Sequence, residues 1–515
     1  MALTSMTPHP ELPTELWEEI FSYLDNRTLA ALTYIRPFRD LAHRLLYSSI
    51  FLALPGSAIG QDKRIYLIHR TFMENPVLGE YVRRVELSSV FAPQQNERLQ
   101  WFNMREECIG GYLGEDMTRI LRGDPPLEHP DSEPVDDDGL TPPWPIYHCD
   151  SLYTMRGQWQ KPGVTWHDIT LIETVYIPGI LQRIPNMRAI MFGQRHIFFT
   201  VDWNLFSHSM RAALVKAFQH KELEKLCISN TINVPSFVLL TTPAVEIQIL
   251  SLSSIVQTES ANRWVRLGRK GGNTYSRSLH RLEITNVASD QKPLLEVFAN
   301  REVDNLYVSP TSAETFLVLN AVCTRRPWAD SITNLTIDVV GLADKIKEGS
   351  WNASEQSMAH LESLTKLKTL QLHIRDWQLD DQQMNGYFWH NIQTRTEIWW
   401  KWAIKALNSA LRTSAPILRD ISLTVTCYGH HDEDFTTTND LVWTALREVL
   451  MEHVERGVRR VRMCFPTPNR FGGGEFPLSL KENNISTVKK HLDGVQGLEL
   501  CHHEDTKNCI DYEPF

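Results

Sequence analysis

Residues 365–374 read TKLKTLQLHI, in which Leu367, Leu370 and Leu372 follow the spacing apolar-x-x-apolar-x-apolar. The last two leucines alternate with polar residues, as expected for a β-strand with one buried face. The same spacing recurs along most of the chain, and we predict a strand at each occurrence. The other triplets are Val82-Val85-Leu87, Met187-Ile190-Phe192, Leu223-Leu226-Ile228, Ile247-Leu250-Leu252, Leu279-Leu282-Ile284, Val303-Leu306-Val308, Ile332-Leu335-Ile337, Leu418-Ile421-Leu423, Val458-Val461-Met463 and Val495-Leu498-Leu500.

Apolar residues with helical spacing lie between several of the predicted strands, for example in residues 316–321 and 398–411. Stacked strand–helix units bury a continuous core that one repeat cannot bury alone. The pattern therefore favours an α/β repeat solenoid, and the alternative is an α/β domain in which the triplets recur by chance. From Ile190 onward, the middle residues of successive triplets lie 24 to 51 positions apart. Several repeats thus exceed the roughly 20 to 29 residues of an ordinary leucine-rich repeat.

The N-terminal residues have a different pattern. Apolar residues at Leu12, Leu16, Trp17, Ile20, Phe21 and Leu24 give a helix with one broad apolar face, and Pro13 suits its first position. Asp25 can cap a second helix, Pro37 interrupts the chain, and a third helix is predicted from Phe38. Three helices in about 40 residues make a unit that rarely supports itself without a metal, a disulfide or a partner.

The order Leu12-Pro13, Glu15-Leu16, Ile20-Phe21-x-Tyr-Leu24, Leu29, Ile35-Arg-Pro-Phe38-Arg-x-Leu41 and Leu45-Leu46-Tyr47 resembles an F-box. The F-box is the three-helix module with which ubiquitin-ligase receptors bind a Skp-family adaptor, and the residues around FRDLAHRLLYSSIFL are similar to fungal F-box proteins. The repeats likewise resemble the degenerate leucine-rich repeats of many F-box receptors. The fold expected from these resemblances is α/β, with an N-terminal three-helix F-box followed by an irregular leucine-rich-repeat-like solenoid.

The resemblance implies a non-catalytic substrate-recognition subunit of an SCF-type cullin ubiquitin ligase. Its partners would be a Skp-family adaptor, a cullin reached through that adaptor, and an unknown target protein. A repeat scaffold that binds the adaptor without target degradation is the alternative. The residues implied at or beside the adaptor surface are Leu12, Pro13, Leu16, Ile20, Phe21 and Leu24, with Leu29 and Phe38 helping to lock the helices together.

Three domains are predicted: an F-box at 9–50, a first repeat-like unit with a linker at 51–186, and the solenoid at 187–515. Residues 124–145 hold seven acidic residues, seven prolines and no Lys or Arg, which predicts an extended surface loop. The solenoid carries a Trp-rich insertion at 374–415.

The alternative for each apolar residue of the F-box is a core position against the following domain.

Residues between the buried positions of a repeat strand face the concave side of a solenoid, where repeat proteins usually bind their partners. Within the insertion, Trp400 is predicted to point away from the core, because Trp399 and Trp402 share a helix face. The alternative for the strand positions is a solvated sheet face. The candidates for target binding are Arg281, Glu283, Tyr307, Asp338, His373, Trp400, Arg460 and Arg462.

Composition excludes several other classes of function. The net charge of −10 gives no basic footprint for nucleic acid, and no apolar run reaches the ~18 residues of a membrane helix. The eight cysteines lack paired spacing and are expected to be buried thiols of an intracellular protein, in the cytoplasm and/or the nucleus. Neither His430-His431 nor Cys501-His502-His503 has a metal-site spacing, and no catalytic constellation is present. We therefore expect no cofactor, no metal and no enzyme activity.

Overall fold

The computed structural model describes residues 14–53, 61–89, 171–194, 201–203, 206–232, 234–251, 278–286, 295, 297–310, 313–340, 361–377, 392–412, 418–428, 439–464 and 478–501. The predicted loop at 124–145 lies outside these ranges. The fold is mixed α/β, with twelve strands in one parallel sheet and a separate two-stranded sheet of β4 and β6. The strand order is β1-β2-β3-β5-β7-β8-β9-β10-β11-β12-β13-β14, so the strands of this sheet are neighbours in the order in which they occur along the chain.

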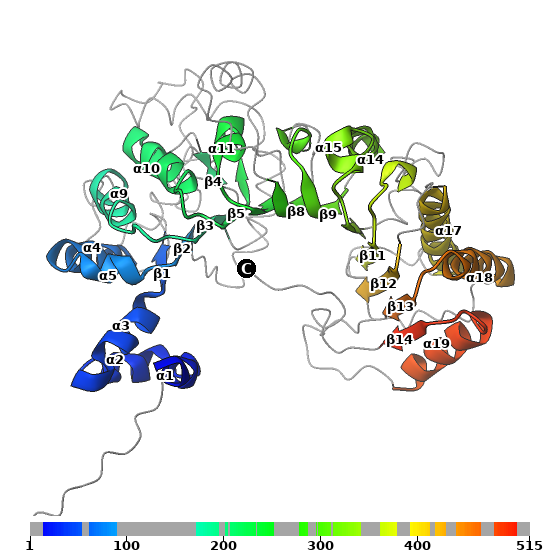
Figure 1. Ribbon diagram of the computed structural model, residues 1–515, viewed down its shortest axis with the longest axis horizontal. Helices are drawn as coiled ribbons and strands as arrows, with labels where there is room; N and C mark the ends of the chain where they lie inside the picture. The colour runs from blue at the N-terminus through cyan, green and yellow to red at the C-terminus, as the bar shows by residue number, and fades with distance from the viewer. Residues whose placement is uncertain are drawn as a thin grey trace, which may run out of the picture. The chain divides into compact units, whose positions relative to one another are not determined.

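The chain divides into two compact units, Met1–Leu226 and Cys227–Phe515. In the first unit, the helices α4, α5, α9 and α10 lie along one side of the strands (Figure 1). Its elements are α1 (Thr14–Ser22), α2 (Asn26–Leu32), η1 (Arg36–Phe38), α3 (Arg39–Tyr47), β1 (Ser49–Ala53), α4 (Gln61–Glu74), α5 (Val77–Tyr81), β2 (Arg84–Ser89), η4 (Ile172–Tyr176), α9 (Ile177–Leu181), β3 (Ala189–Gln194), β4 (Val201–Asp202), α10 (His208–Phe218) and β5 (Lys225–Ser229), which crosses the division.

In the second unit, the helices α14, α15, α17, α18 and α19 follow one face of the strands (Figure 1). The opposite face of β7 to β14, which carries none of the described helices, is called the polar face below. The elements of this unit are β6 (Thr231–Ile232), α11 (Ser236–Thr241), β7 (Glu246–Ser251), β8 (Leu279–Asn286), β9 (Val303–Ser309), α14 (Ala313–Cys323), α15 (Arg326–Ala329), β10 (Asn334–Val340), η7 (Leu361–Ser363), β11 (Thr369–Trp377), α17 (Ile392–Leu411), β12 (Asp420–Tyr428), α18 (Asp440–Glu455), β13 (Arg460–Cys464), α19 (Leu478–His491) and β14 (Leu498–Cys501).

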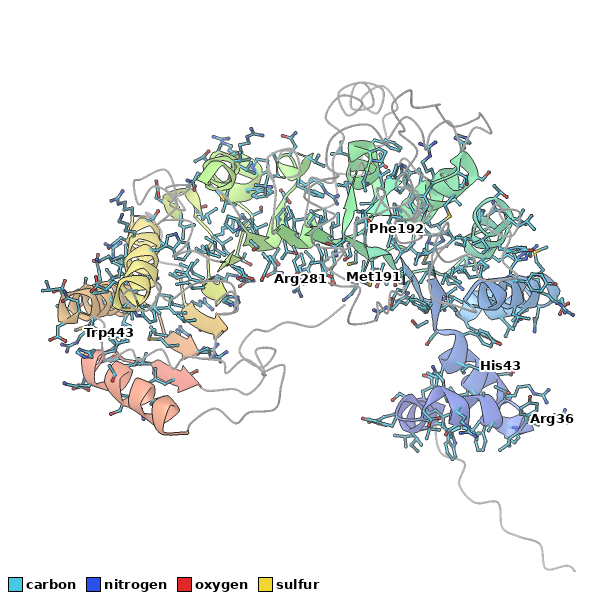
Figure 2. All side chains as sticks on the ribbon, turned by 180° about the vertical axis from the view of Figure 1, so that it is seen from behind. Arg36, His43, Met191, Phe192, Arg281 and Trp443 are labelled. Atoms are coloured by element: carbon cyan, nitrogen blue, oxygen red, sulfur yellow. The ribbon has the colours of Figure 1, made fainter. Side chains whose placement is uncertain are left out.

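Ten of the eleven predicted triplets coincide with strands in the expected register. The middle residues Leu282, Leu306, Leu335, Leu370, Ile421 and Val461 occupy one row of the sheet and are at most 2% exposed. Side chains that follow one another in a strand point to opposite faces, as Met191 and Phe192 of β3 do (Figure 2). Phe192 packs against Trp203, Phe206 and Phe218 at ring-centroid distances of 6.0, 5.6 and 5.9 Å.

One predicted triplet was in the wrong register. In β7 the buried residues are Ile247 and Ile249, preceded by the buried Ala244, whereas Leu250 is half-buried on the opposite face. Residues 244–252, Ala-Val-Glu-Ile-Gln-Ile-Leu-Ser-Leu, contain two overlapping triplets, and the sequence prediction chose the one with larger side chains. The true repeat begins at a small residue, Ala244.

A twelfth strand was missed. β1 pairs in parallel with β2, and its Ile50 and Leu52 are 7% and 0% exposed. Tyr47, Ile50 and Leu52 have the same spacing as the other triplets. They were missed because they overlap the end of the N-terminal helices, where helical spacing dominated the interpretation.

The cysteines match the sequence expectation only in part. Burial raises the pKa of the Cys323 thiol to about 12, as expected for an inert core thiol. Cys464, at the end of β13, is instead disulfide-bonded, so it is not the thiol that we expected. The parallel register places residue 464 opposite residue 501, a proximity that their positions along the chain do not reveal.

His453 joins α18 to α17 and makes the second unit sensitive to acid. Its Nε2–H donates to the Leu407 carbonyl across 3.1 Å, and burial lowers the pKa of His453 to about 4. The other contributions are smaller: Arg456 also lowers this pKa, while the Leu407 carbonyl and Glu452 raise it. The folded protein therefore holds His453 neutral at pH values where the unfolded chain binds a proton.

We expect the free energy of unfolding to lose about 2 kcal/mol between pH 7.5 and pH 5.0 because of His453 alone. The stabilisation is complete above the ordinary pKa of 6.5 and falls as the pH drops towards about 4. Urea denaturation of the wild type and of His453→Gln, whose amide can still donate to Leu407, measures the difference. Equal pH slopes in both proteins would contradict this role.

Candidate functional site

The helix α1 exposes an apolar stripe. Leu16 and Ile20 are 43% and 44% exposed, and Tyr23, one turn further, is 82% exposed. Leu16 and Ile20 lie four residues apart and share one face of α1, and Tyr23 lies in the turn that directly follows the helix. Tyr34 and Ile35, which follow α2, are also exposed, at 86% and 45%. We call Leu16, Ile20 and Tyr23 the α1 stripe.

The opposite face of α1 builds a core for the three helices. Phe21, Leu29 and Leu41 are buried, and Trp17, Leu24 and Phe38 pack against them. The rings of Trp17 and Phe21 lie 5.0 and 5.4 Å from the ring of Phe38. The side chain of Asp25 caps α2 by accepting from the Thr28 N–H at 2.6 Å, and this hydrogen bond lowers the pKa of Asp25.

The eight predicted adaptor-binding residues do not share one environment in the structure. Leu16 and Ile20 are exposed, and Leu29 and Phe38 lie between the helices as expected. Phe21, at 3% exposed, is a core residue and not the surface residue that we expected, because it faces Phe38 between the helices. Leu24 is half-buried against the same core, and Leu12 and Pro13 lie outside the described residues. Tyr23, Tyr34 and Ile35 were missed, although Tyr23 continues the spacing of Leu16 and Ile20.

The three helices join the sheet of the first unit without a linker. The Ser48 carbonyl, at the end of α3, accepts from the backbone N–H groups of Arg83 and Arg84 at 2.8 and 3.0 Å. The Tyr47 ring lies 6.3 Å from the ring of Phe72. In Figure 2, His43 on α3 lies between the sheet and Arg36, which marks the far part of the module. The unit of three helices thus gains its support from α3, while the α1 stripe stays open.

In the second unit, polar side chains form rows across the polar face. Because neighbouring strands lie about 4.8 Å apart, residues in register are close neighbours. Arg281 lies on this face in Figure 2. The first row is Arg281, Asn305, Asn334, Thr369, Asp420 and Arg460, and the second is Gln248, Glu283, Tyr307, Thr336, Gln371, Ser422, Arg462 and Glu499. The third contains Asp338, His373, Thr424 and Cys464.

Three of the predicted target-binding residues meet on this face. The Tyr307 hydroxyl donates to the Asp338 carboxylate, and the Tyr307 ring meets the His373 ring edge-on with centroids 6.5 Å apart. Closer to the beginnings of the strands, Arg281 Nη2 in the first row lies 3.3 Å from Glu283 Oε2 in the second row. The two arginines of β13 also form ion pairs, Arg460 with Asp420 at 3.0 Å and Arg462 with Glu499 at 3.6 Å.

Several of these residues are buried, which fits neither an open binding surface nor the alternative of a solvated sheet face. Glu283, Asp338 and His373 are only 2%, 1% and 2% exposed. The larger side chains of adjacent strands explain much of this burial, since Tyr307 lies against Asp338 and His373, and Arg281 lies against Glu283. Burial also extends to Ser309 and Thr424, which the sequence analysis did not select. Both lie between buried apolar residues in the sequence, and this pattern could have predicted that they are buried.

Trp400 is a core residue and not an exposed candidate. It is 0% exposed, and its ring lies 5.3 Å from the ring of Trp443 in α18. The prediction assumed that α17 buries a single face. Because α18 packs beside it, α17 buries a second face, and Trp400 lies there.

No protein-family model matches the chain, and no curated protein is similar enough to it to be matched. In the described part of the chain, no helix combines the length and the apolar character that crossing a membrane requires. The same residues contain no group of three or more His, Cys, Asp or Glu side chains positioned to hold a metal ion.

Tyr307→Phe tests the buried contact with Asp338. Removing the hydroxyl takes a donor from a carboxylate that is 1% exposed, and we expect a loss of about 1 to 3 kcal/mol in the free energy of unfolding. Urea denaturation measures this change. Tyr34→Phe, at a position that is 86% exposed, is the matched control and is expected to leave stability unchanged. A loss of similar size in both variants would contradict the interpretation.

Proposed function

We propose that this protein is the substrate-recognition subunit of an SCF-type cullin ubiquitin ligase. In this proposal α1 to α3 form an F-box that binds a Skp-family adaptor. The strand–helix repeats are a leucine-rich-repeat-like solenoid that holds the target protein. The chain itself supplies no catalytic residue, because its task is to raise the effective concentration of the target beside the ubiquitin-loading enzyme.

The observation that supports the proposal most strongly is the α1 stripe. The three helices already possess a core of Phe21, Leu29 and Leu41, so Leu16 and Ile20 are not needed to complete it. Yet each leaves more than two fifths of its surface exposed on a helix of only nine residues. An exposed apolar stripe bordered by charged residues is typical of a surface that a partner covers.

The repeats suit the second half of the proposed function. A parallel sheet of stacked strand–helix units offers a long face for another protein. On the polar face, the buried contacts of Glu283, Asp338 and His373 fix the neighbouring side chains, while Arg460 remains about half exposed. The more exposed arginines of β13 are therefore better placed to reach a target than the buried central residues.

The double variant Leu16→Asp/Ile20→Asp tests adaptor binding. A charge placed in the apolar interface should weaken binding by about a hundredfold or more, because the carboxylates lose water without gaining a partner. Co-expression of the full chain with a Skp-family adaptor, followed by affinity capture, measures the effect. Since both positions are exposed, the circular dichroism spectrum and the Tm should not change.

Leu441→Asp is the matched control, because Leu441 is 75% exposed on α18 and lies outside the proposed interface. This variant should capture the adaptor as the wild type does. A wild-type chain that captures no adaptor would remove the proposal. Equal capture by the double variant would show that the α1 stripe is not the contact.

The same double variant separates degradation from scaffolding. Proximity labelling in cells, with the labelling enzyme fused to each full-length chain, should mark the same targets with the wild type and the double variant. Targets of a ubiquitin-ligase receptor should rise in abundance with the double variant, because the ligase no longer reaches them. Targets that are labelled but keep the same abundance would favour a scaffold.

A further inference from the structure

Three exposed cations stand in line at the starts of adjacent strands. Lys368, Arg419 and Arg459 immediately precede β11, β12 and β13, and all three are exposed. Each follows the first apolar residue of its triplet, so the repeat places them at equivalent positions. We call them the cation ladder; the three strands lie side by side in Figure 1.

Backbone hydrogen bonds hold the ladder in register. The Arg419 N–H donates to the Lys368 carbonyl at 2.7 Å, and the Arg459 N–H donates to the Arg419 carbonyl at 2.7 Å. Parallel strands lie about 4.8 Å apart, so the three residues span about 10 Å. Gly497 of the next repeat supports this arrangement, since a Cβ there would lie 2.3 Å from the Arg459 carbonyl oxygen and its φ is +73°.

The ladder is not neutralised by the described residues. Neither a hydrogen bond nor an ion pair of the three side chains is found among them, whereas the neighbouring Asp420 is already paired with Arg460 at 3.0 Å. In two earlier repeats the equivalent positions hold His280 and Asp304 instead of two cations, and these two side chains lie 3.4 Å apart. Like charges at neighbouring positions of a sheet are destabilising. The fold therefore maintains three unpaired cations at a cost in stability.

We propose that the cation ladder binds an acidic, extended segment of the target protein. This inference rests on the proposed function, because it names the chemistry of the target that the repeats hold. An extended chain advances about 3.3 to 3.6 Å per residue, so three or four residues bearing carboxylates match the span of the ladder. The chain as a whole carries a net charge of −10, which opposes binding of an acidic segment elsewhere on its surface. Binding therefore depends on the local positive charge of the three ladder side chains.

Fluorescence polarisation on the purified full chain tests the proposal without any adaptor. The probe is a fluorescein-labelled peptide with four Asp-Glu repeats, and its neutral counterpart has four Asn-Gln repeats. We expect the acidic peptide to bind, the neutral peptide not to bind, and affinity to fall when the salt concentration rises from 50 to about 500 mM. Lys368→Gln/Arg419→Gln/Arg459→Gln should weaken binding about tenfold.

The matched control changes the same charge elsewhere. Lys216, Lys489 and Lys490 are exposed on α10 and α19, and their triple replacement by Gln should leave peptide binding unchanged. Arg419→Gln alone, at the centre of the ladder, should weaken binding about threefold and provides a variant with less risk to folding. Relief of the like-charge repulsion should keep the Tm of the ladder variant equal to or above that of the wild type.

Three results would overturn the inference. The first is equal loss of peptide binding in the ladder and control variants. The second is a Tm several degrees lower in the ladder variant, which would assign the cations a structural role. The third is a ten-nucleotide single-stranded RNA that binds more tightly than the peptide and depends on the same three residues. None of these results affects adaptor capture, so failure here is distinguishable from failure of the proposed function.

Discussion

The structure depends on the burial of one apolar row that runs from strand to strand. Each repeat contributes a residue such as Leu335 or Leu370, which is fully buried between the sheet and its helices. Because neighbouring strands are parallel and in register, the alternate residues are forced onto the opposite face, also in rows. The polar contacts of Tyr307 and the alignment of the exposed cations both follow from this constraint.

The period-2 alternation made most strands predictable, but it did not settle where every repeat begins. It located ten strands in the observed register, and in eight of them a polar residue separates the two apolar residues; the exceptions are Met191 in β3 and Cys227 in β5. It failed in β7, where Ile249 and Leu250 are adjacent and both strand faces carry apolar residues. It also missed β1, since Ile50 follows directly on a helical pattern.

Burial was harder to predict than position. The sequence indicated which residues share the polar face, but not that Asp338 and His373 would be covered by neighbours such as Tyr307. Trp400 shows the same limit, because its burial depends on α18, more than 30 residues further along the chain. In the N-terminal helices, by contrast, local spacing was enough to separate the exposed Leu16 and Ile20 from the buried Leu29. Phe21 was misplaced because its contact with Phe38 crosses between helices.

The junction at Ser48 has a consequence for how this protein can be divided. β1 starts one residue after that junction, and among the described strands it pairs with β2 alone. A truncation that removes the helices by cutting near residue 50 would therefore also remove part of a strand. It would turn β2 into an unprotected sheet edge, whose free N–H and C=O groups can pair with other chains. A fragment designed at Ser48 keeps that edge covered and is the safer form of the repeat region to produce alone.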